Sequence, residues 1–418
     1  MKVYKFGGAS VKDAAGIRNL AKIVSAEPGN LVVVVSAFGK TTNALEKVLK
    51  TWLKGDNGYK ILLDEIYQYH KSVFEELFTD RKSSTDKLDT LFVGLREYLL
   101  SEKIKEYDYE YDQVVSYGEL WSTIIVAEYL KSRLPGVELF DIRDCIKTDD
   151  RYRDANINWE ESITKTNSVF NFLNTRIYIT QGFIAGTAKG DTSTLGREGS
   201  DYTAAVIANM LNADSVTVWK DVPGILNADP AWMDEVQLLE EISYREAVEM
   251  TFSGAKVIHP KTIKPLHNKK IPLFVKSFIN PSSGGTIIKS DAVPKKIIPV
   301  FIKKERQILI TIIPRDFSFV MDENLSRIFH VFMQHGIKVN LVEASAVSID
   351  VCVDDDIRRI DKLIKDMNFE FALVYNENVE MLTIRHYTPA AVNKITEGRE
   401  ILLEQRTRST VRFVVRKE

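Results

Sequence analysis

The chain has little cysteine, no long apolar run and almost no net charge, and each shortage excludes a class of protein. Its 418 residues include only two cysteines, Cys145 and Cys352, without C-x-x-C or metal-ligand spacing, so we expect buried thiols in a reducing compartment. Apolar runs such as residues 31–35 are far shorter than the about 20 residues that span a bilayer, and no apolar signal core follows Met1. The 56 basic residues nearly balance 58 acidic ones, which argues against nucleic-acid binding. We therefore expect a cytoplasmic protein without membrane or nucleic-acid partners.

The length of the chain predicts two or three domains, because one hydrophobic core usually stops growing at about 250–300 residues. Up to about residue 290, short apolar runs alternate with longer helical patterns. This alternation predicts an α/β domain in which helices cover a mostly parallel sheet. The predicted strands are residues 3–6, 31–35, 176–185, 215–219 and 273–278.

The pattern changes after the turn at 281–285 and the charged segment 291–296. A βαββαβ order follows, and it begins again at residue 379 but stops after βαββ. The strand at 297–303 precedes the first of these units and is free to complete the second. The other predicted strands are 308–314, 339–345, 347–353, 369–375, 379–386, 401–405 and 410–415, and the helices are 325–334, 357–367 and the segment between Thr388 and Gly398.

Two polar loops follow the first two strands. Lys5 ends a strand that runs into Gly7 and Gly8 before a helix, where backbone N–H groups can bind phosphate and Lys5 can add a charge. The alternative is that these glycines only form a tight turn. The loop 36–43 is either a ligand-binding loop at the sheet edge or an N-capped helix start. It is not a P-loop, because Val34 stands where that motif needs glycine.

Three later segments add charged groups. Residues 195–201 place Arg197 and Asp201 around glycines before a helix, although Asp201 alone is also explained as an N-cap. Residues 220–224 form a turn after a strand, and residues 254–260 carry Lys256 and His259, a histidine more typical of a hydrogen-bonded core position than of a catalyst. Lysines, an arginine and glycine loops with few histidines favour phosphoryl transfer over hydrolysis or redox chemistry.

Five ordered blocks resemble the signature segments of aspartate kinase in the amino acid kinase superfamily, and the resemblance covers essentially the whole chain. The blocks are residues 5–11, 35–43, 116–122, 195–204 and 254–260. The resemblance implies a three-layer α/β/α amino acid kinase fold with a mostly parallel sheet, followed by two ferredoxin-like (βαββαβ) ACT units. The implied domains are a catalytic domain at 1–290, an inserted ACT domain at 305–377, and a shortened ACT domain made of 295–304 and 378–418.

The same resemblance implies an activity and residue roles. The enzyme would phosphorylate the side-chain carboxylate of L-aspartate with ATP and Mg²⁺, the first step towards lysine, threonine, methionine and isoleucine; no residue is assigned as a metal ligand. The implied catalytic residues are Lys5, Asp201 and Lys256. The implied substrate contacts are Ser36, Thr42, Glu119, Arg197 and Ser200. The implied nucleotide contacts are Lys5, Gly7, Gly8, Ala9, Lys220, Asp221, Leu226, Lys256 and Val257.

Several positions depart from the family pattern. Ala9 and Glu198 replace the usual threonine and glycine, and Leu226 and Ala231 replace tyrosine and arginine. Glu198 is expected to strain a loop that needs positive φ and to crowd the substrate. Two alternatives remain: a kinase for another small amino acid of the superfamily, and a non-catalytic ACT sensor.

The ACT units also imply an amino acid effector at their interface and a homodimer or higher oligomer. Lysine-sensing relatives usually have acidic residues where Asn340 and Ala346 stand. Because an ammonium needs charged partners when it leaves water, we expect weak or no inhibition by lysine. The effector would then be neutral in its side chain, such as threonine, or the ACT pair would only hold the dimer together.

Overall fold

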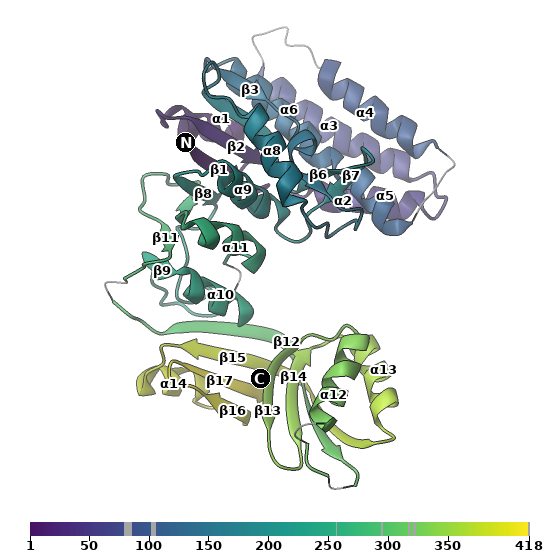
Figure 1. Ribbon diagram of the computed structural model, residues 1–418, viewed down its shortest axis with the longest axis vertical. Coiled ribbons are helices and arrows are strands. Elements are labelled where there is room, and N and C mark those ends of the chain that lie inside the picture. Colours follow the sequence, from purple (N-terminus) through teal and green to yellow (C-terminus); the bar gives the residue numbers. More distant parts are fainter. Residues whose placement is uncertain are drawn as a thin grey trace. The chain divides into compact units, whose positions relative to one another are not determined.

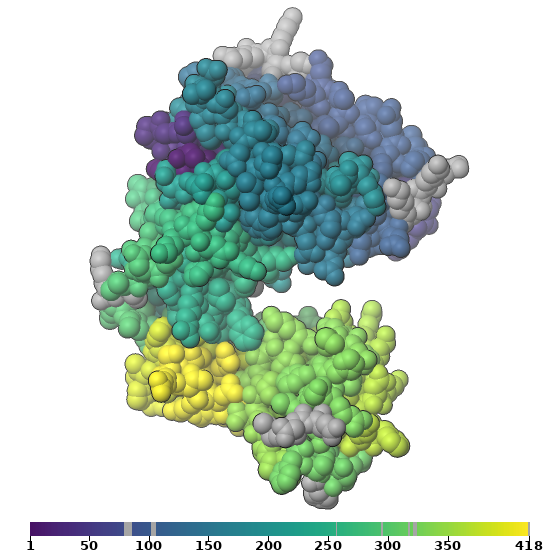
Figure 2. Space-filling view, viewed as in Figure 1, coloured from purple at the N-terminus to yellow at the C-terminus, as the bar shows by residue number. Residues whose placement is uncertain are grey.

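The structure is a computed structural model that describes residues 1–78, 86–101, 106–255, 257–293, 296–316, 318–320 and 323–416. The chain divides into two compact units (Figure 1). The first unit comprises residues 1–225, 238–247 and 258–293, and the second comprises 226–237, 248–257 and 294–418. In the space-filling view, the second unit contains the light green to yellow residues (Figure 2).

An eight-stranded, mostly parallel sheet forms the centre of the first unit, as predicted. Strand β1 (Lys2–Phe6) lies between β2 (Leu31–Val35) and β8 (Ser215–Lys220), and all three run parallel. The order is β3-β5-β2-β1-β8-β10-β11-β9. The remaining strands are β3 (Val137–Leu139), β5 (Ile177–Gln181), β9 (Glu241–Ser243), β10 (Leu273–Ser277) and β11 (Thr286–Lys289). Every residue of β2 is buried, which explains its unbroken apolar sequence because both faces of the sheet are covered.

Helices supply the two outer layers. Helices α1 to α6 share one core with alternate residues of the central strands, including Leu31, Val33 and Val35, and Trp121 stacks on Phe92 within it. Helix α9 also contacts β1, β2 and β8, and α8 and α11 pack on α9. The helices of this unit are α1 (Ala14–Ser25), α2 (Thr41–Trp52), α3 (Tyr59–Leu77), α4 (Asp86–Leu99), α5 (Tyr107–Val115), α6 (Tyr117–Lys131), α7 (Ile142–Cys145), α8 (Trp159–Val169), α9 (Gly199–Met210), α11 (Pro260–Lys269) and α10 (Tyr244–Phe252), the last shared between the units.

The strand predicted over 176–185 is not one strand. The chain leaves the large sheet after β5, and β6 (Ile184–Thr187) joins a small sheet with β4 (Lys147–Thr148) and β7 (Thr192–Thr194). At the break, Phe183 has φ of +68°, and residue 182 must be glycine because a Cβ there would lie 2.5 Å from the Cβ of Ser200. The small sheet places β7 directly before the glycine-rich loop at 195–199.

The second unit contains a six-stranded antiparallel sheet in the order β13-β14-β12-β15-β17-β16. The sequence predicted separate strands on either side of residue 305 and of residue 377. Instead, β12 (Val300–Pro314) and β15 (Phe371–Arg385) run through both ACT-like halves, with a register shift between Lys304 and Gln307. The other elements are α12 (Glu323–Gln334), β13 (Val339–Ala344), β14 (Ile349–Asp354), α13 (Ile357–Met367), α14 (Pro389–Thr396), β16 (Ile401–Arg406) and β17 (Thr410–Arg416).

Both halves of this unit are ferredoxin-like in strand order, and each has its own apolar core. Segment 226–237 belongs to the second core, where Met233 packs with Phe301 and the Phe301 N–H donates to the Asn227 carbonyl. The two predicted thiols, Cys145 and Cys352, are buried and unpaired. Across the described residues, no helix has both the length and the apolar character needed to cross a membrane.

Candidate active site

A cavity of about 570 Å³ opens in the first unit beside the carboxyl ends of β1, β2 and β8. Ligands of open α/β sheets bind at this edge. The cavity brings together most of the residues that the sequence singled out: Lys5, Gly7, Gly8, Ala9, Ser36, Thr42, Glu119, Arg197, Ser200, Asp201, Lys220 and Asp221. Leu226 and Val257 belong to the second unit and do not line this cavity, and Lys256 lies outside the described residues. The roles of these three residues stay predictions.

A buried group of charges lies at one end of the cavity. The Lys5 Nζ is 2.6 Å from Asp201 Oδ1, and the Lys220 Nζ is 3.9 Å from Asp201 Oδ2. Burial opposes ionisation of Asp201, but the charges of Lys5 and Lys220 hold the pKa of this carboxyl below its usual value. Asp201 is not the N-cap of α9, because Glu198 occupies that position. The geometry therefore favours the hypothesis that Asp201 orients Lys5 and Lys220.

The two loops after β1 and β2 pack tightly on each other. The Gly39 N–H donates to the Gly8 carbonyl at 3.0 Å, and a Cβ on residue 8 would lie 2.7 Å from the Ala37 carbonyl oxygen. Gly8 is therefore needed for this close approach, whereas neither Gly7 nor Gly8 has positive φ. The packing sets the first glycine loop beside the polar loop that carries Ser36.

The lining also contains a buried carboxyl group, that of Glu119. Glu119 lies in the first turn of α6, and its Oε1 accepts the Ala37 N–H at 3.3 Å. Its Oε2 is buried and has no hydrogen-bond partner among the described residues. Burial raises the pKa of Glu119 to about 8, against the smaller opposing effects of the backbone bond and of Lys5. A buried acid in this state is ready to receive a cationic ligand group.

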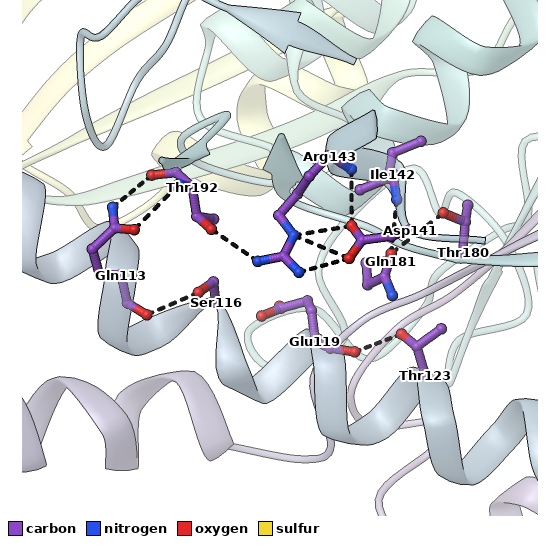
Figure 3. Close-up of polar contacts among 10 residues, drawn as sticks. All are labelled: Gln113, Ser116, Glu119, Thr123, Asp141, Ile142, Arg143, Thr180, Gln181 and Thr192. Carbon is purple, nitrogen blue, oxygen red and sulfur yellow. Dashed lines mark hydrogen bonds and ion pairs between the residues drawn. The ribbon is translucent and has the colours of Figure 1, made fainter. Parts of the chain in front are cut away.

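Helix α5 holds the strand that leads to Arg197. The Gln113 side chain bonds both the N–H and the carbonyl of Thr192, and Arg143 donates to the Thr192 hydroxyl while it pairs with Asp141 (Figure 3). One residue earlier on α5, Asp112 accepts the N–H and the hydroxyl of Thr194, at 2.8 and 2.7 Å. These bonds fix β7, and with it the start of the loop that carries Arg197 into the cavity lining.

Glu198 has the backbone conformation that the sequence led us to expect, with φ of +54°. Its Oε2 accepts the His259 N–H at 2.9 Å, so the side chain connects the glycine loop to the start of α11. His259 is the N-cap of α11, where its Nδ1 accepts the Lys261 N–H at 3.2 Å. His259 is therefore hydrogen-bonded, as predicted, but it is a partly buried helix cap and not a core residue.

Four lining residues escaped the sequence analysis: Tyr111, Arg153, Phe183 and Trp219. Arg153 and Phe183 both have φ of +68°, a conformation that no sequence pattern at these positions indicates. Tyr111 lies on α5, and Trp219 lies in β8. Within the described part of the chain, no group of three or more His, Cys, Asp or Glu side chains could hold a metal ion.

Comparison with known proteins gives concordant results. The amino acid kinase family model matches residues 1–277. The chain is 32% identical over 358 residues to lysine-sensitive aspartokinase 3 of Escherichia coli (strain K12), covering 84% of this chain and 78% of that protein. It is also 32% identical over 292 residues to the chloroplastic bifunctional aspartokinase/homoserine dehydrogenase 2 of Arabidopsis thaliana, but this match spans 68% of this chain and only 32% of that protein.

A solved structure extends the similarity to the fold of the whole chain. Escherichia coli aspartokinase III in complex with aspartate and ADP has a TM-score of 0.83 and 28% identity to this chain, and the match covers 100% of this chain and 96% of that one.

The raised pKa of Glu119 predicts a pH-dependent stability. Between its unfolded pKa of about 4.3 and the folded value of about 8, the folded state binds the extra proton, so stability falls as pH rises and levels off above pH 8. E119Q is neutral throughout and should lose none of this stability. Thermal unfolding midpoints measured at pH 5, 6.5 and 8 should rise for E119Q relative to the wild type as the pH increases. E128Q, on the same helix but more exposed, is the control; equal midpoint differences at all three pH values would contradict the assignment.

Proposed function

The chain is an aspartate kinase of the amino acid kinase family, and from this premise we propose that it transfers the γ-phosphoryl group of ATP to the side-chain carboxylate of L-aspartate as the entry step to lysine, threonine, methionine and isoleucine. The observation that carries this proposal is the arrangement of charges in the cavity. Lys5 and Lys220 flank Asp201, and the buried Glu119 Oε2 has no hydrogen-bond partner among the described residues.

Glu119 and Arg197 have charges that suit an acceptor amino acid with a free amine. The Glu119 carboxylate can pair with an ammonium, and Arg197 can bind a carboxylate with two parallel hydrogen bonds. An N-acylated acceptor such as N-acetylglutamate offers no positive charge, and it would leave the buried Glu119 without a partner. Arrival of the ammonium would favour ionised Glu119, so binding below pH 8 should release a proton.

Lys5 and Asp201 suit a phosphoryl transfer that is catalysed by positioning and charge neutralisation. Lys5 lies at the end of a buried strand, and Asp201 fixes its ammonium where it can contact the transferring group. We propose that Mg²⁺ enters with ATP, held by phosphate oxygens, water and Asp-type ligands such as Asp221, since the described residues contain no ready metal cluster. Lys256, Val257 and Leu226 complete the proposed nucleotide contacts.

The second unit offers a poor site for a free lysine. Asn340 is buried, its Oδ1 accepts a hydrogen bond from the Lys304 Nζ at 2.8 Å, and its Nδ2 donates to Gln307 and Asp354. The Lys304 Nζ is also 2.6 Å from Asp354 Oδ1. The ammonium group of Lys304 therefore occupies the position beside Asn340, and the ammonium of a bound lysine would have to displace it.

Trapping of acyl phosphate with hydroxylamine tests the proposed reaction. Product should form with ATP, Mg²⁺ and aspartate, and not with glutamate or N-acetylglutamate. K5A should lower kcat by about 100-fold or more, because it removes a charge that acts on the transferring group. K2A is the matched control on the same strand, where Lys2 pairs with Glu27 away from the cavity. Absence of product with aspartate would refute the proposed function, and near-normal turnover of K5A would refute the role of Lys5.

We also propose that the protein is at least a homodimer formed through its second unit. Strands β13 and β16 are the outermost strands of the six-stranded sheet, and outermost strands favour pairing between chains even though Gln405 of β16 already donates to the Val342 carbonyl of β13. Light scattering at micromolar concentration should give the mass of a dimer or more, and a monomer would contradict the proposal.

Lysine should inhibit this kinase weakly or not at all. Without a carboxylate at position 340, and with Lys304 already beside it, lysine should lose roughly 30-fold or more in affinity relative to a site with charged partners. Activity titrated with lysine and threonine, separately and together, checks this expectation. Half-inhibition by sub-millimolar lysine alone would show the charge argument to be wrong.

A further inference from the structure

Arg153 is a cation of the cavity lining that has no role so far. It lies in the loop between β4 and α8, and it lines the cavity together with Thr42, Tyr111 and Glu119. Its side chain is 46% exposed, so it is accessible to a ligand.

The structure holds this arginine in place from two sides. Its backbone has φ of +68°, and its N–H donates to Asp112 Oδ2 at 2.9 Å. Its guanidinium lies 4.7 Å from the centre of the Tyr111 ring and 5.5 Å from that of Tyr107. Strained conformations of this kind persist only where the surroundings enforce them, and they concentrate at functional sites.

The guanidinium retains donors for a ligand. Arg153 Nη1 bonds Asp108 Oδ1 at 3.1 Å, and both side chains are about half exposed. A guanidinium has five N–H donors, and such an exposed pair contributes little to stability. The Asp108 contact orients the side chain while other donors remain available.

The charges of the substrate decide what these donors would bind. Aspartate carries an ammonium and two carboxylates. Glu119 has the charge to receive the ammonium, and the reacting carboxylate must approach Lys5. The α-carboxylate also needs a cation. Lys5 and Lys220 flank Asp201, which leaves Arg197 and Arg153 as the cations of the described lining that can bind it.

We propose that Arg153 is a specificity-determining residue that binds the α-carboxylate of the acceptor together with Arg197, and that Asp112 is its positioning residue. This inference rests on the proposed function, because it assigns a second arginine to the same substrate. Two arginines select for an acceptor that is charged at the α-carboxyl group and discriminate against α-amides and α-esters.

R153G tests the proposal with little structural disturbance, since glycine adopts φ of +68° without strain. The KM for aspartate should rise about tenfold, as expected for a lost charge-assisted hydrogen bond, while kcat and the KM for ATP change little. R153K, which keeps the charge but not the planar fork, should give an intermediate KM. R151A is the matched control, because Arg151 lies in the same loop but does not line the cavity.

The α-amide of aspartate separates a binding role from a structural one. With this acceptor, which lacks the α-carboxylate charge, R153G and the wild type should have KM values within about twofold, since the lost interaction is not made. Equal KM values of R153G and wild type for aspartate would overturn the proposal. A tenfold higher KM of R153G for both acceptors would also overturn it. If R153G does not fold, the same comparison of aspartate with its α-amide is made with R153K. Failure of the wild type to phosphorylate aspartate would instead refute the proposed function.

Discussion

The ion pair between Lys5 and Asp201 is the interaction on which the rest of the cavity depends. Both side chains are almost buried, with 11% and 3% exposure, and charges so far from water are tolerated only when they are paired. The pair connects the central strand β1 to the first turn of α9, and Lys220 adds a second cation from β8. Three elements from distant parts of the sequence are thereby joined at the point where an anionic group would be transferred.

The same cavity keeps two buried carboxyl groups in opposite states. Neighbouring lysines hold the pKa of Asp201 below its usual value, whereas burial raises the pKa of Glu119 to about 8 against the weaker effect of Lys5. Different environments thus give two carboxyl groups different charges. In the proposed reaction, Asp201 would stay ionised beside the lysines, and Glu119 would gain its charge when an ammonium arrives. An empty site therefore avoids the full cost of an unpaired buried charge.

The sequence predicted the fold class and most of the cavity because both depend on local patterns. Apolar runs locate the strands, and glycine-rich loops after strands lie at one edge of a parallel sheet. What it missed depends on tertiary contacts. Gly182 packs against Ser200, which leaves no room for a Cβ where the strand breaks. Strands β12 and β15 each continue through both halves of the second unit, although Arg306 and Asn378 have positive φ within the register shifts. No local pattern carries that information.

Helix α5 illustrates how much of the site rests on a residue without any sequence signal. The single carboxylate of Asp112 accepts bonds from Thr194, directly before the glycine loop, and from the backbone of Arg153. The segments that carry Arg197 and Arg153 are therefore fixed to one buried group, and burial raises its pKa to about 6. Because a buried network is strong only when every member is satisfied, displacement of either segment would weaken the hold on the other. Asp112 on α5 is thus a common anchor for the two loops in which the arginines lie.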